Sequence, residues 1–526
     1  MSTTDVKLST YEKIGYSLGD AAANFVWRST FFLPIFYTDT FGLAAAQTAI
    51  LILVIRLSDG VTDVLMGSIA DRTNTRYGKF RPWVLWSAPV LGLFLALLFT
   101  TPDLSDGGKL VYAYVIYFGL TLAYTANNVP YGALMGVMTS SVQERSVLAS
   151  FRFIGAFSGG LLVMALTPYL VGFFGQGDRA EGYKYTMMVF AVLLVVFLIV
   201  TYLSTKERIV PEPVDTGSLK NEIWDICKNL PIILIPISGI SVLFIFLSLN
   251  YEEMNIPQLA NHFKLGALGY CVAAFALTLF MRKWLINKPK DLCSPLQKDL
   301  ADLLTNKPWL ILLLVGIMFG LFTVVRPSAA SYYFKYVLGR EDLIGVYFAV
   351  TLVASLAAAV VTGYLSGKIS KRNLMIIAFA GGSIFNGLIF WIQPEQVSFM
   401  FFLAIVGEFF AGMMPVLFFS MLGDTADYSE WKNNRRATGL IFSAGTFINK
   451  TGHGFAGAIV LMVLAYLGYD AANEASIANS IVGMKMLMSL IPAFIGVLAI
   501  IFVWTYPLDD ARMQEIEAEL NARREA

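Results

Sequence analysis

The strongest constraint in this sequence is a series of apolar runs, each about 20 residues long. A helix of that length crosses the roughly 30 Å hydrocarbon core of a bilayer. Helices are favoured because backbone groups in lipid must be hydrogen-bonded within their own segment. Twelve runs are clear, at 15–38, 46–70, 83–100, 110–138, 147–174, 185–203, 309–338, 343–366, 374–392, 398–421, 438–466 and 481–505. Two more lie at 231–249 and 267–286, so the sequence predicts an all-α membrane protein with about fourteen transmembrane helices.

The composition agrees with a chain embedded in a lipid bilayer. Of its 526 residues 57% are hydrophobic and 14% are charged, and the mean hydropathy is +0.65. Such a chain has more apolar surface than a soluble protein needs. The formal net charge of +1 and the lack of a long basic run argue against a nucleic-acid partner. The polar N-terminus lacks the apolar core of a removable signal peptide, so the first span is expected to stay in place.

The basic residues predict an orientation in the inner (cytoplasmic) membrane. Lys and Arg gather in the loops after the second, fourth, sixth and eighth spans, and the intervening loops are poorer in both. By the positive-inside rule, both termini are expected to be cytoplasmic. The cysteines Cys227, Cys271 and Cys293 have neither a CxxC spacing nor a histidine cluster, and no structural metal site is expected.

Four segments follow from this pattern. We expect an N-terminal six-helix bundle with a cation site at 1–211, a linker with two inserted helices at 212–295, a C-terminal six-helix bundle at 296–510, and a cytoplasmic tail at 511–526. Residues 219–234 resemble 296–311 at an offset of 77 positions, which suggests insertion by partial duplication or a chance likeness of two linkers. The sequence carries no signal for an oligomeric state.

The second span contains three charges in the segment RLSDGVTD. Arg56, Asp59 and Asp63 stand at i, i+3 and i+7, which places them on one face of a helix. A charge at bilayer depth costs at least about 2.5 to 3.5 kcal/mol, so it needs a counter-charge or a wet cavity. Two adjacent carboxylates repel unless a proton or a metal cation lies between them. The pattern predicts a coupling-cation site. The alternative is that Arg56 neutralises one aspartate to allow packing, or that the charged group lies near the end of the helix.

The first span also carries polar residues on one face of an otherwise apolar helix. Asp20, Asn24, Trp27 and Arg28 share one face of the predicted helix. A carboxylate, an amide, a guanidinium and a flat ring form a plausible sugar-binding wall. An internal ion pair with aromatic packing would explain the same residues.

Further polar residues lie within other spans. Asn128 and Thr125 offer neutral ligands in the fourth span, and Arg152 lies in the fifth, although interhelical hydrogen bonding and snorkelling to the interface would also explain them. In the second half of the chain, Tyr332 and Lys450 are candidate sugar-binding residues. Two segments, 71–83 and 424–439, are dense in charge, which is typical of a solvated surface. Alternatively, they lock the two halves together, and the candidate coupling or gating residues are Arg56, Lys450, Asp71, Arg72, Arg145, Asp424, Asp427 and Glu430. The chain has no GxxxxGK[ST] phosphate loop, so gradient-driven transport is expected.

These motifs resemble the glycoside-pentoside-hexuronide:cation symporters of the major facilitator superfamily. The resemblance runs in order through GYSLGDAAAN, FYTDTFGL, RLSDGVTDVLMGSIADRTNTRYGKFRPW, NNVPYGALMG, ERSVLASFR, NKPWLILL, YYFKYVLG and GDTADYSEWK. It implies two six-helix bundles that rock around a central site by alternating access. It also implies that Asp59, Asp63 and Thr125 bind the cation, which would be Na⁺ at Asp59 and Asp63 if the protein is sodium-coupled. Sugar-binding roles are implied for Asp20, Asn128 and Arg152, with Lys450 near both sites.

Departures from the family pattern bear on the substrate. Asn128 stands where melibiose permease has an aspartate, and Gly132 stands where it has a tryptophan, so galactoside recognition is not carried over. Arg28 is not required by the resemblance, and with Arg152 it makes the cavity more positive than a neutral-sugar site needs. A guanidinium suits a carboxylate, which favours a uronide or a short uronic-acid oligosaccharide.

The sequence therefore predicts a secondary active symporter and not an enzyme, for a small-molecule sugar and a monovalent cation. The coupling ion is Na⁺ or H⁺, and no other cofactor is expected. One alternative is a symporter for a neutral glycoside or pentoside, and another is a non-transporting membrane sensor or scaffold of the same fold. Hydrolysis is disfavoured because Asp59 and Asp63 lie one turn apart on one helix and do not flank a scissile bond from opposite faces.

Overall fold

The computed structural model describes residues 7–139, 142–208, 257–288, 295–366, 368–433 and 438–525. It divides into two compact units. The N-terminal unit comprises Met1–Ile226 and Arg340–Ala349, and the C-terminal unit comprises Cys227–Gly339 and Val350–Ala526.

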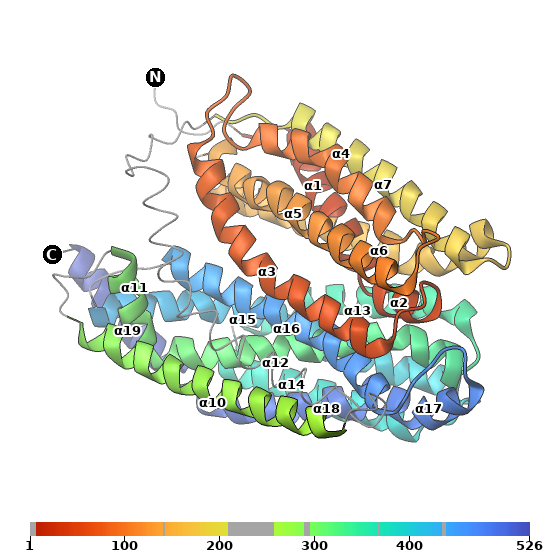
Figure 1. Cartoon of the computed structure of the whole chain (residues 1–526). Coiled ribbons are helices and arrows are strands. Elements are labelled where there is room, and N and C mark those ends of the chain that lie inside the picture. The colour runs from red at the N-terminus through yellow and green to blue at the C-terminus, as the bar shows by residue number, and fades with distance from the viewer. Residues whose placement is uncertain are drawn as a thin grey trace. The chain divides into compact units, whose positions relative to one another are not determined.

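The N-terminal unit is a bundle of long helices (Figure 1). Its helices are α1 (Thr10–Ser29), α2 (Leu33–Asp39), α3 (Ala45–Arg72), α4 (Arg81–Leu98), α5 (Asp106–Met138), α6 (Val142–Gly175) and α7 (Arg179–Ser204), followed much later by the 3₁₀ turn η3 (Glu341–Leu343). Helix α1 packs against both α6 and α7, α4 packs against α5 and α7, and α3 packs against α5. The α1 and α3 faces that carry the predicted site residues therefore belong to one bundle.

Helix α1 begins at a capping box and packs very closely against α6. The side chains of Ser9 and Glu12 accept each other's backbone N–H groups, which satisfies two donors at the helix start. Gly155 and Gly159 of α6 face the α1 backbone. A Cβ atom at Gly155 would lie 2.0 Å from the Ser17 carbonyl oxygen, and one at Gly159 would lie 2.4 Å from the Ala21 carbonyl oxygen. The two glycines thus set the distance between the helices.

The C-terminal unit is also helical in its described part. Its elements are α10 (Pro257–Asn287), α11 (Pro295–Leu304), α12 (Lys307–Tyr332), the π-helical turn η2 (Tyr333–Val337), α13 (Ile344–Leu365, from Val350 onward), α14 (Lys371–Leu388), the 3₁₀ turn η4 (Ile389–Trp391), α15 (Val397–Asn433), α16 (Thr438–Tyr466), α17 (Glu474–Met488), α18 (Leu490–Trp504) and α19 (Asp510–Glu525). Helix α12 packs against α16 and α18, and α14 packs against α15 and α18.

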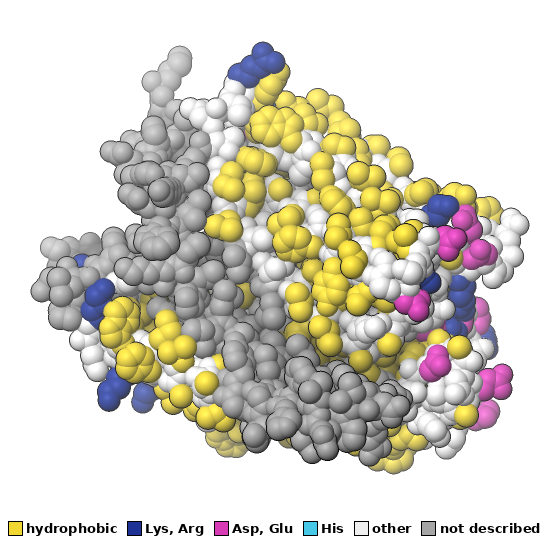
Figure 2. Space-filling view, viewed as in Figure 1, with side chains coloured by type: hydrophobic (Ala, Val, Ile, Leu, Met, Phe, Trp, Pro, Cys, Tyr) yellow, Lys and Arg dark blue, Asp and Glu magenta, His cyan; other side chains and the backbone are white. Residues whose placement is uncertain are grey.

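The surface is that of a membrane protein. Ten helical segments of the described residues are long and apolar enough to span a bilayer. On α5 the side chains of Val111, Val115, Phe118 and Leu122 form an exposed apolar stripe. Figure 2 shows hydrophobic side chains across the visible face of the N-terminal unit and charged ones gathered toward its ends. A multi-pass helical membrane protein is confirmed.

The predicted number of fourteen spans stays a prediction. The run at 231–249 lies outside the described residues, and the run at 267–286 falls within α10, which is not among the ten. Two predicted spans are interrupted: α1 ends at Ser29 and α2 begins at Leu33, while α17 ends at Met488 and α18 begins at Leu490. A proline follows each break, and its missing N–H leaves the carbonyl four residues earlier, at Thr30 or Met488, without the regular helical partner.

Residues 511–526, expected to form a tail, lie almost entirely in helix α19. Its residues Met513, Ile516 and Leu520 are buried, and the helix packs against the end of α15. There the Trp431 indole N–H donates a 2.6 Å hydrogen bond to Glu519, and the Arg523 guanidinium donates to the Trp431 carbonyl.

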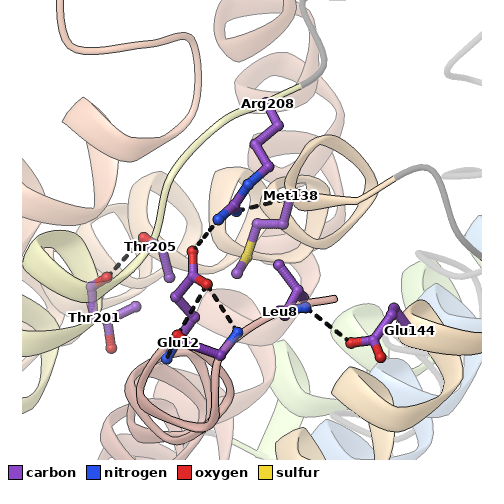
Figure 3. Close-up of polar contacts among 8 residues, drawn as sticks. Leu8, Glu12, Met138, Glu144, Thr201, Thr205 and Arg208 are labelled. Atoms are coloured by element: carbon purple, nitrogen blue, oxygen red, sulfur yellow. Dashed lines mark hydrogen bonds and ion pairs between the residues drawn. The ribbon is translucent and has the colours of Figure 1, made fainter. Parts of the chain in front are cut away.

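A cluster of polar contacts ties the helix ends of the N-terminal unit together (Figure 3). Arg208, just after α7, donates to the Glu12 carboxylate at 2.6 Å, and its backbone N–H donates to the Val137 carbonyl of α5. Lys13 of α1 forms a 2.9 Å ion pair with Glu144 of α6. This end of the bundle is therefore bound together by charge as well as by packing.

Candidate functional site

The two acidic residues of α3 meet a hydroxyl of α5. The Thr125 Oγ1 atom lies 2.9 Å from Asp63 Oδ1 and 3.3 Å from Asp59 Oδ1. Asp59 and Thr125 are buried, at 3% and 2% exposure. The structure thus brings the three predicted cation ligands together within one unit. Carboxylate and hydroxyl oxygens are the donor set that hard cations prefer.

Thr62 adds a fourth oxygen that sequence reasoning missed. Its hydroxyl lies 3.4 Å from that of Thr125 and also donates to the Asp59 carbonyl. Thr62 stands between Asp59 and Asp63 in the sequence, and the i+3 spacing from Asp59 could have suggested it.

A cavity opens beside this oxygen cluster in the same unit. Its lining includes Asp59 and Arg56 of α3, Trp27 of α1, and Tyr117 and Tyr124 of α5. The Arg56 guanidinium lies over the Trp27 ring at 4.2 Å from its centroid. One face of the indole is therefore covered by a cation, which limits the predicted sugar stacking on Trp27 to its other face.

Arg56 is not paired with a carboxylate in the described part of the chain. Its Nη2 atom donates to the Thr30 hydroxyl at 3.3 Å, and Thr30 in turn donates to the Trp27 carbonyl at 2.7 Å. The packing alternative required Arg56 to neutralise Asp59 or Asp63, and this structure shows the guanidinium on Trp27 instead.

Asp20 and Arg152 form the other polar centre of the unit. The Arg152 Nε atom lies 2.7 Å from Asp20 Oδ2, and the guanidinium faces the Tyr131 ring at 5.4 Å. Tyr131 stacks on Tyr16 with ring centroids 4.7 Å apart, and each hydroxyl donates to the other residue's carbonyl. The two tyrosines, which the sequence did not single out, form a rigid base under the ion pair.

The remaining predicted residues of the first half lie at varied distances from these centres. Asn24 donates from its side chain to the Asp20 carbonyl at 3.0 Å, which is a local helical contact. The Arg28 guanidinium lies over Phe31 at 5.6 Å. Asn128 is half-buried on α5, and a Cβ atom at Gly132 would meet nothing within 4 Å.

The predicted residues of the second half belong to the C-terminal unit. Tyr332 is fully buried near the end of α12 and packs edge-on against Tyr469, and Lys450 is half-buried on α16. Asp424 forms an ion pair with Lys371 at 2.7 Å. Asp427 and Glu430 lie further along α15. The side chains of Asp71, Arg72 and Arg145 lie outside the described part, so the predicted lock stays a prediction.

The C-terminal unit also contains a buried ion pair. Arg326 of α12, only 2% exposed, contacts Glu408 of α15 and donates to the Asn386 side chain of α14 at 2.7 Å. The Ser355 hydroxyl of α13 donates to the same Glu408 carboxylate at 2.7 Å. Glu408 is thus an ionic and hydrogen-bonded junction of four helices.

Comparison with known proteins identifies the family. The family model described as "MFS/sugar transport protein" matches residues 15–255 and 264–510. The chain belongs to this family. Within the major facilitator superfamily it is a member of the glycoside-pentoside-hexuronide:cation symporter group, and it is therefore a transporter and not an enzyme.

Individual relatives of this sugar transport protein cover nearly its whole length. It is 32% identical to "Putative glycoside/cation symporter YagG" of Escherichia coli K12, over 99% of this chain and 96% of the relative. It is 27% identical to "Glucuronide carrier protein homolog" of the same organism, over 98% and 97%. A solved proton-dependent oligopeptide transporter has a TM-score of 0.62 at 12% identity, covers 97% of this chain and 100% of its own, and shows the fold alone.

Proposed function

We propose that this family member is an inner-membrane symporter that couples the uptake of a sugar to a monovalent cation. The observation that carries this proposal is the Thr125 hydroxyl, which lies within hydrogen-bond distance of both Asp59 and Asp63. Two carboxylates one turn apart on α3 repel each other, and a bound Na⁺ or H⁺ relieves that repulsion. The symporter name of a full-length relative supports the coupling.

The sugar site in this proposal lies beside the cation site in the same unit. Asp20 and Arg152 offer an acceptor and donors to sugar hydroxyls. Trp27 and Tyr124, with ring centroids 6.2 Å apart, provide aromatic surface. Tyr332 and Lys450 would complete the site from the C-terminal unit during alternating access, in which the two bundles expose the site to each side of the membrane in turn.

For the substrate, we propose an anionic sugar, a uronide or a short uronic-acid oligosaccharide. Two guanidiniums, Arg28 of α1 and Arg152 of α6, belong to this unit, and a guanidinium suits a carboxylate. The open space at Gly132 suits a ligand longer than one ring. A relative named as a glucuronide carrier homologue supports the same class. The competing candidate is a neutral glycoside or pentoside.

Transport in proteoliposomes tests the function. The full chain would be reconstituted, and uptake of labelled methyl glucuronide and methyl glucoside would be followed under a Na⁺ gradient, a proton gradient or neither. We expect uphill accumulation under one of the gradients, and loss of that accumulation in Asp59→Asn and Asp63→Asn. Cation-independent sugar binding without accumulation would favour a sensor or scaffold instead.

A further inference from the structure

The cavity in the N-terminal unit is lined by a guanidinium, that of Arg56, which forms no ion pair with a carboxylate among the described residues. Within the described residues, the Arg56 guanidinium has a hydroxyl and aromatic rings around it but no carboxylate within ion-pair distance. Arg152, in the other polar centre of this unit, differs because Asp20 offsets its charge at 2.7 Å. A charge at membrane depth costs several kcal/mol unless a counter-ion or water accompanies it. Of these two guanidiniums, that of Arg56 therefore has the greater need for an anion.

A second donor faces the same cavity. The Tyr117 hydroxyl is buried beside the Arg56 guanidinium and, among the residues that the structure describes, has no acceptor for its own proton. Its ring lies 5.9 Å from the Arg56 guanidinium, and both residues line the cavity. A buried hydroxyl whose proton has no acceptor loses free energy relative to water, and a ligand oxygen in the cavity would restore the missing bond.

The surroundings of Arg56 fix its orientation. Trp27 supports one face of the guanidinium, and Thr30 accepts from Nη2 because its own proton is already donated to the Trp27 carbonyl. A guanidinium held in this way loses little side-chain entropy when its remaining N–H groups bind a planar anion. The carboxylate is the anion that matches this geometry.

We propose that Arg56 and Tyr117 form the subsite that binds the carboxylate of the transported sugar. This inference rests on the proposed symport of an anionic sugar, and it moves the anion contact from Arg28 and Arg152 to α3. Asp59 lies one turn further along α3 and lines the same cavity. A cation bound at Asp59 removes a negative charge beside the subsite, so cation binding strengthens carboxylate binding, and the reverse holds by linkage.

Two probes that differ only in the anion test this subsite. Binding of methyl β-D-glucuronide and methyl β-D-glucoside to the purified full chain would be measured by calorimetry, with and without the coupling cation. We expect Arg56→Gln to raise the Kd for the glucuronide about tenfold or more and that for the glucoside less than about threefold. Tyr117→Phe, which removes one oxygen atom, should weaken glucuronide binding about fivefold to tenfold.

The matched control is Tyr506→Phe. Tyr506 has a buried hydroxyl without a hydrogen-bond partner in the described residues, but it belongs to the C-terminal unit. Its loss should leave both affinities unchanged. If Arg56→Gln does not fold, Arg56→Lys serves instead: it keeps the charge and loses the planar fork, so glucuronide binding should still weaken severalfold.

Equal losses for both probes, or no loss in Arg56→Gln and Tyr117→Phe, would overturn the subsite. A wild-type preference for the glucoside would also overturn it. Either result leaves cation:sugar symport standing provided that Asp59→Asn still abolishes gradient-driven accumulation, so failure of this inference is distinguishable from failure of the proposed function.

Discussion

Asp20 of α1 and Arg152 of α6 are 132 positions apart in the sequence and form an ion pair of 2.7 Å. The pair lies where Gly155 and Gly159 bring α6 closest to α1, and Tyr131 supports the guanidinium from α5. Three helices of the N-terminal unit, α1, α5 and α6, thus contribute side chains around this ion pair, which makes it a first target for mutation.

Neutralising either partner should impair sugar binding. Asp20→Asn and Arg152→Gln each leave a partly buried charge without its counter-ion, so we expect the sugar Kd to rise about tenfold or more. In a double-mutant cycle measured by sugar binding, the coupling energy between the two positions should be about 1 to 3 kcal/mol. Strictly additive losses would show that the two side chains act independently on the sugar.

Thr125→Val should weaken cation binding and leave the fold intact. The change removes the one hydroxyl shared by Asp59 and Asp63 while keeping the branched shape of the side chain. We expect the cation concentration for half-maximal uptake to rise about tenfold, whereas Thr125→Ser, which keeps the hydroxyl, should lie close to wild type. An unchanged cation dependence in Thr125→Val would remove Thr125 from the cation site.

Acidification should loosen the end of the N-terminal unit drawn in Figure 3. Burial raises the pKa of the Glu12 carboxyl, but hydrogen bonds from Arg208 and Ser9 outweigh it and hold the pKa below its usual value of 4.5. Stability from this group is therefore present above about pH 4.5 and is lost as the pH falls through the lowered folded-state value. The loss should be about 1 kcal/mol or less, because Arg208 is partly exposed.

Thermal unfolding in detergent between pH 3 and 7 measures this effect. The variant Glu12→Gln should be less stable than wild type at pH 7 and nearly equal to it at the acid end. A constant difference between the two proteins across this range would contradict the assignment to Glu12.

Closer packing should not be tolerated at Gly155. Gly155→Ala places a Cβ atom against the Ser17 carbonyl, so α1 and α6 must separate, and we expect a loss of about 1 to 3 kcal/mol. Gly172→Ala on the same helix is the control, because a Cβ atom there meets nothing within 4 Å. Equal thermal stability of the two variants would show that the α1–α6 contact adapts at little cost.

Removing one partner of the Arg326–Glu408 ion pair in the C-terminal unit should cost more stability than removing both. Arg326→Met or Glu408→Met alone leaves one buried charge uncompensated, with an expected loss of about 3 to 5 kcal/mol. The double variant Arg326→Met/Glu408→Met should recover most of that loss. Thermal unfolding of the three variants measures this effect. A double variant no more stable than either single variant would mean that the hydrogen bonds of Asn386 and Ser355 to the two charged groups contribute most of the stability.

Helical spacing predicted which residues share a face, and this was enough for part of the site. The i, i+4 relation of Asp59 and Asp63 predicted that both acids share one face of α3, and the family resemblance, not the spacing, implied Thr125 as their neighbour. Spacing within one helix does not determine which side chain of another helix fills the space. For this reason the packing of Arg56 on Trp27 was not predicted, and an ion pair of Arg56 with an aspartate was only the alternative to the cation site. The place of Tyr117 beside Arg56 was not predicted either.

Hydropathy found the membrane helices but not their interruptions. The apolar run at 15–38 reads continuously through residues 30–32, where the structure ends one helix and starts another. Pro34 supplies the local reason, yet α5 and α15 continue through Pro130 and Pro415. Whether a proline ends a helix depends on which neighbouring groups satisfy the freed carbonyl, and a hydropathy profile contains no such information.

The docked helix α19 has a practical consequence for handling the protein. The helix buries Met513, Ile516 and Leu520 and contacts Trp431. Residues of α19 are therefore part of the packed structure and should not be removed. A truncation at 510 would expose apolar surface at the end of α15. A reporter fused directly to Ala526 would disturb the packing of α19. Purification tags and fluorescent reporters for the experiments above therefore belong behind a long flexible spacer at this terminus.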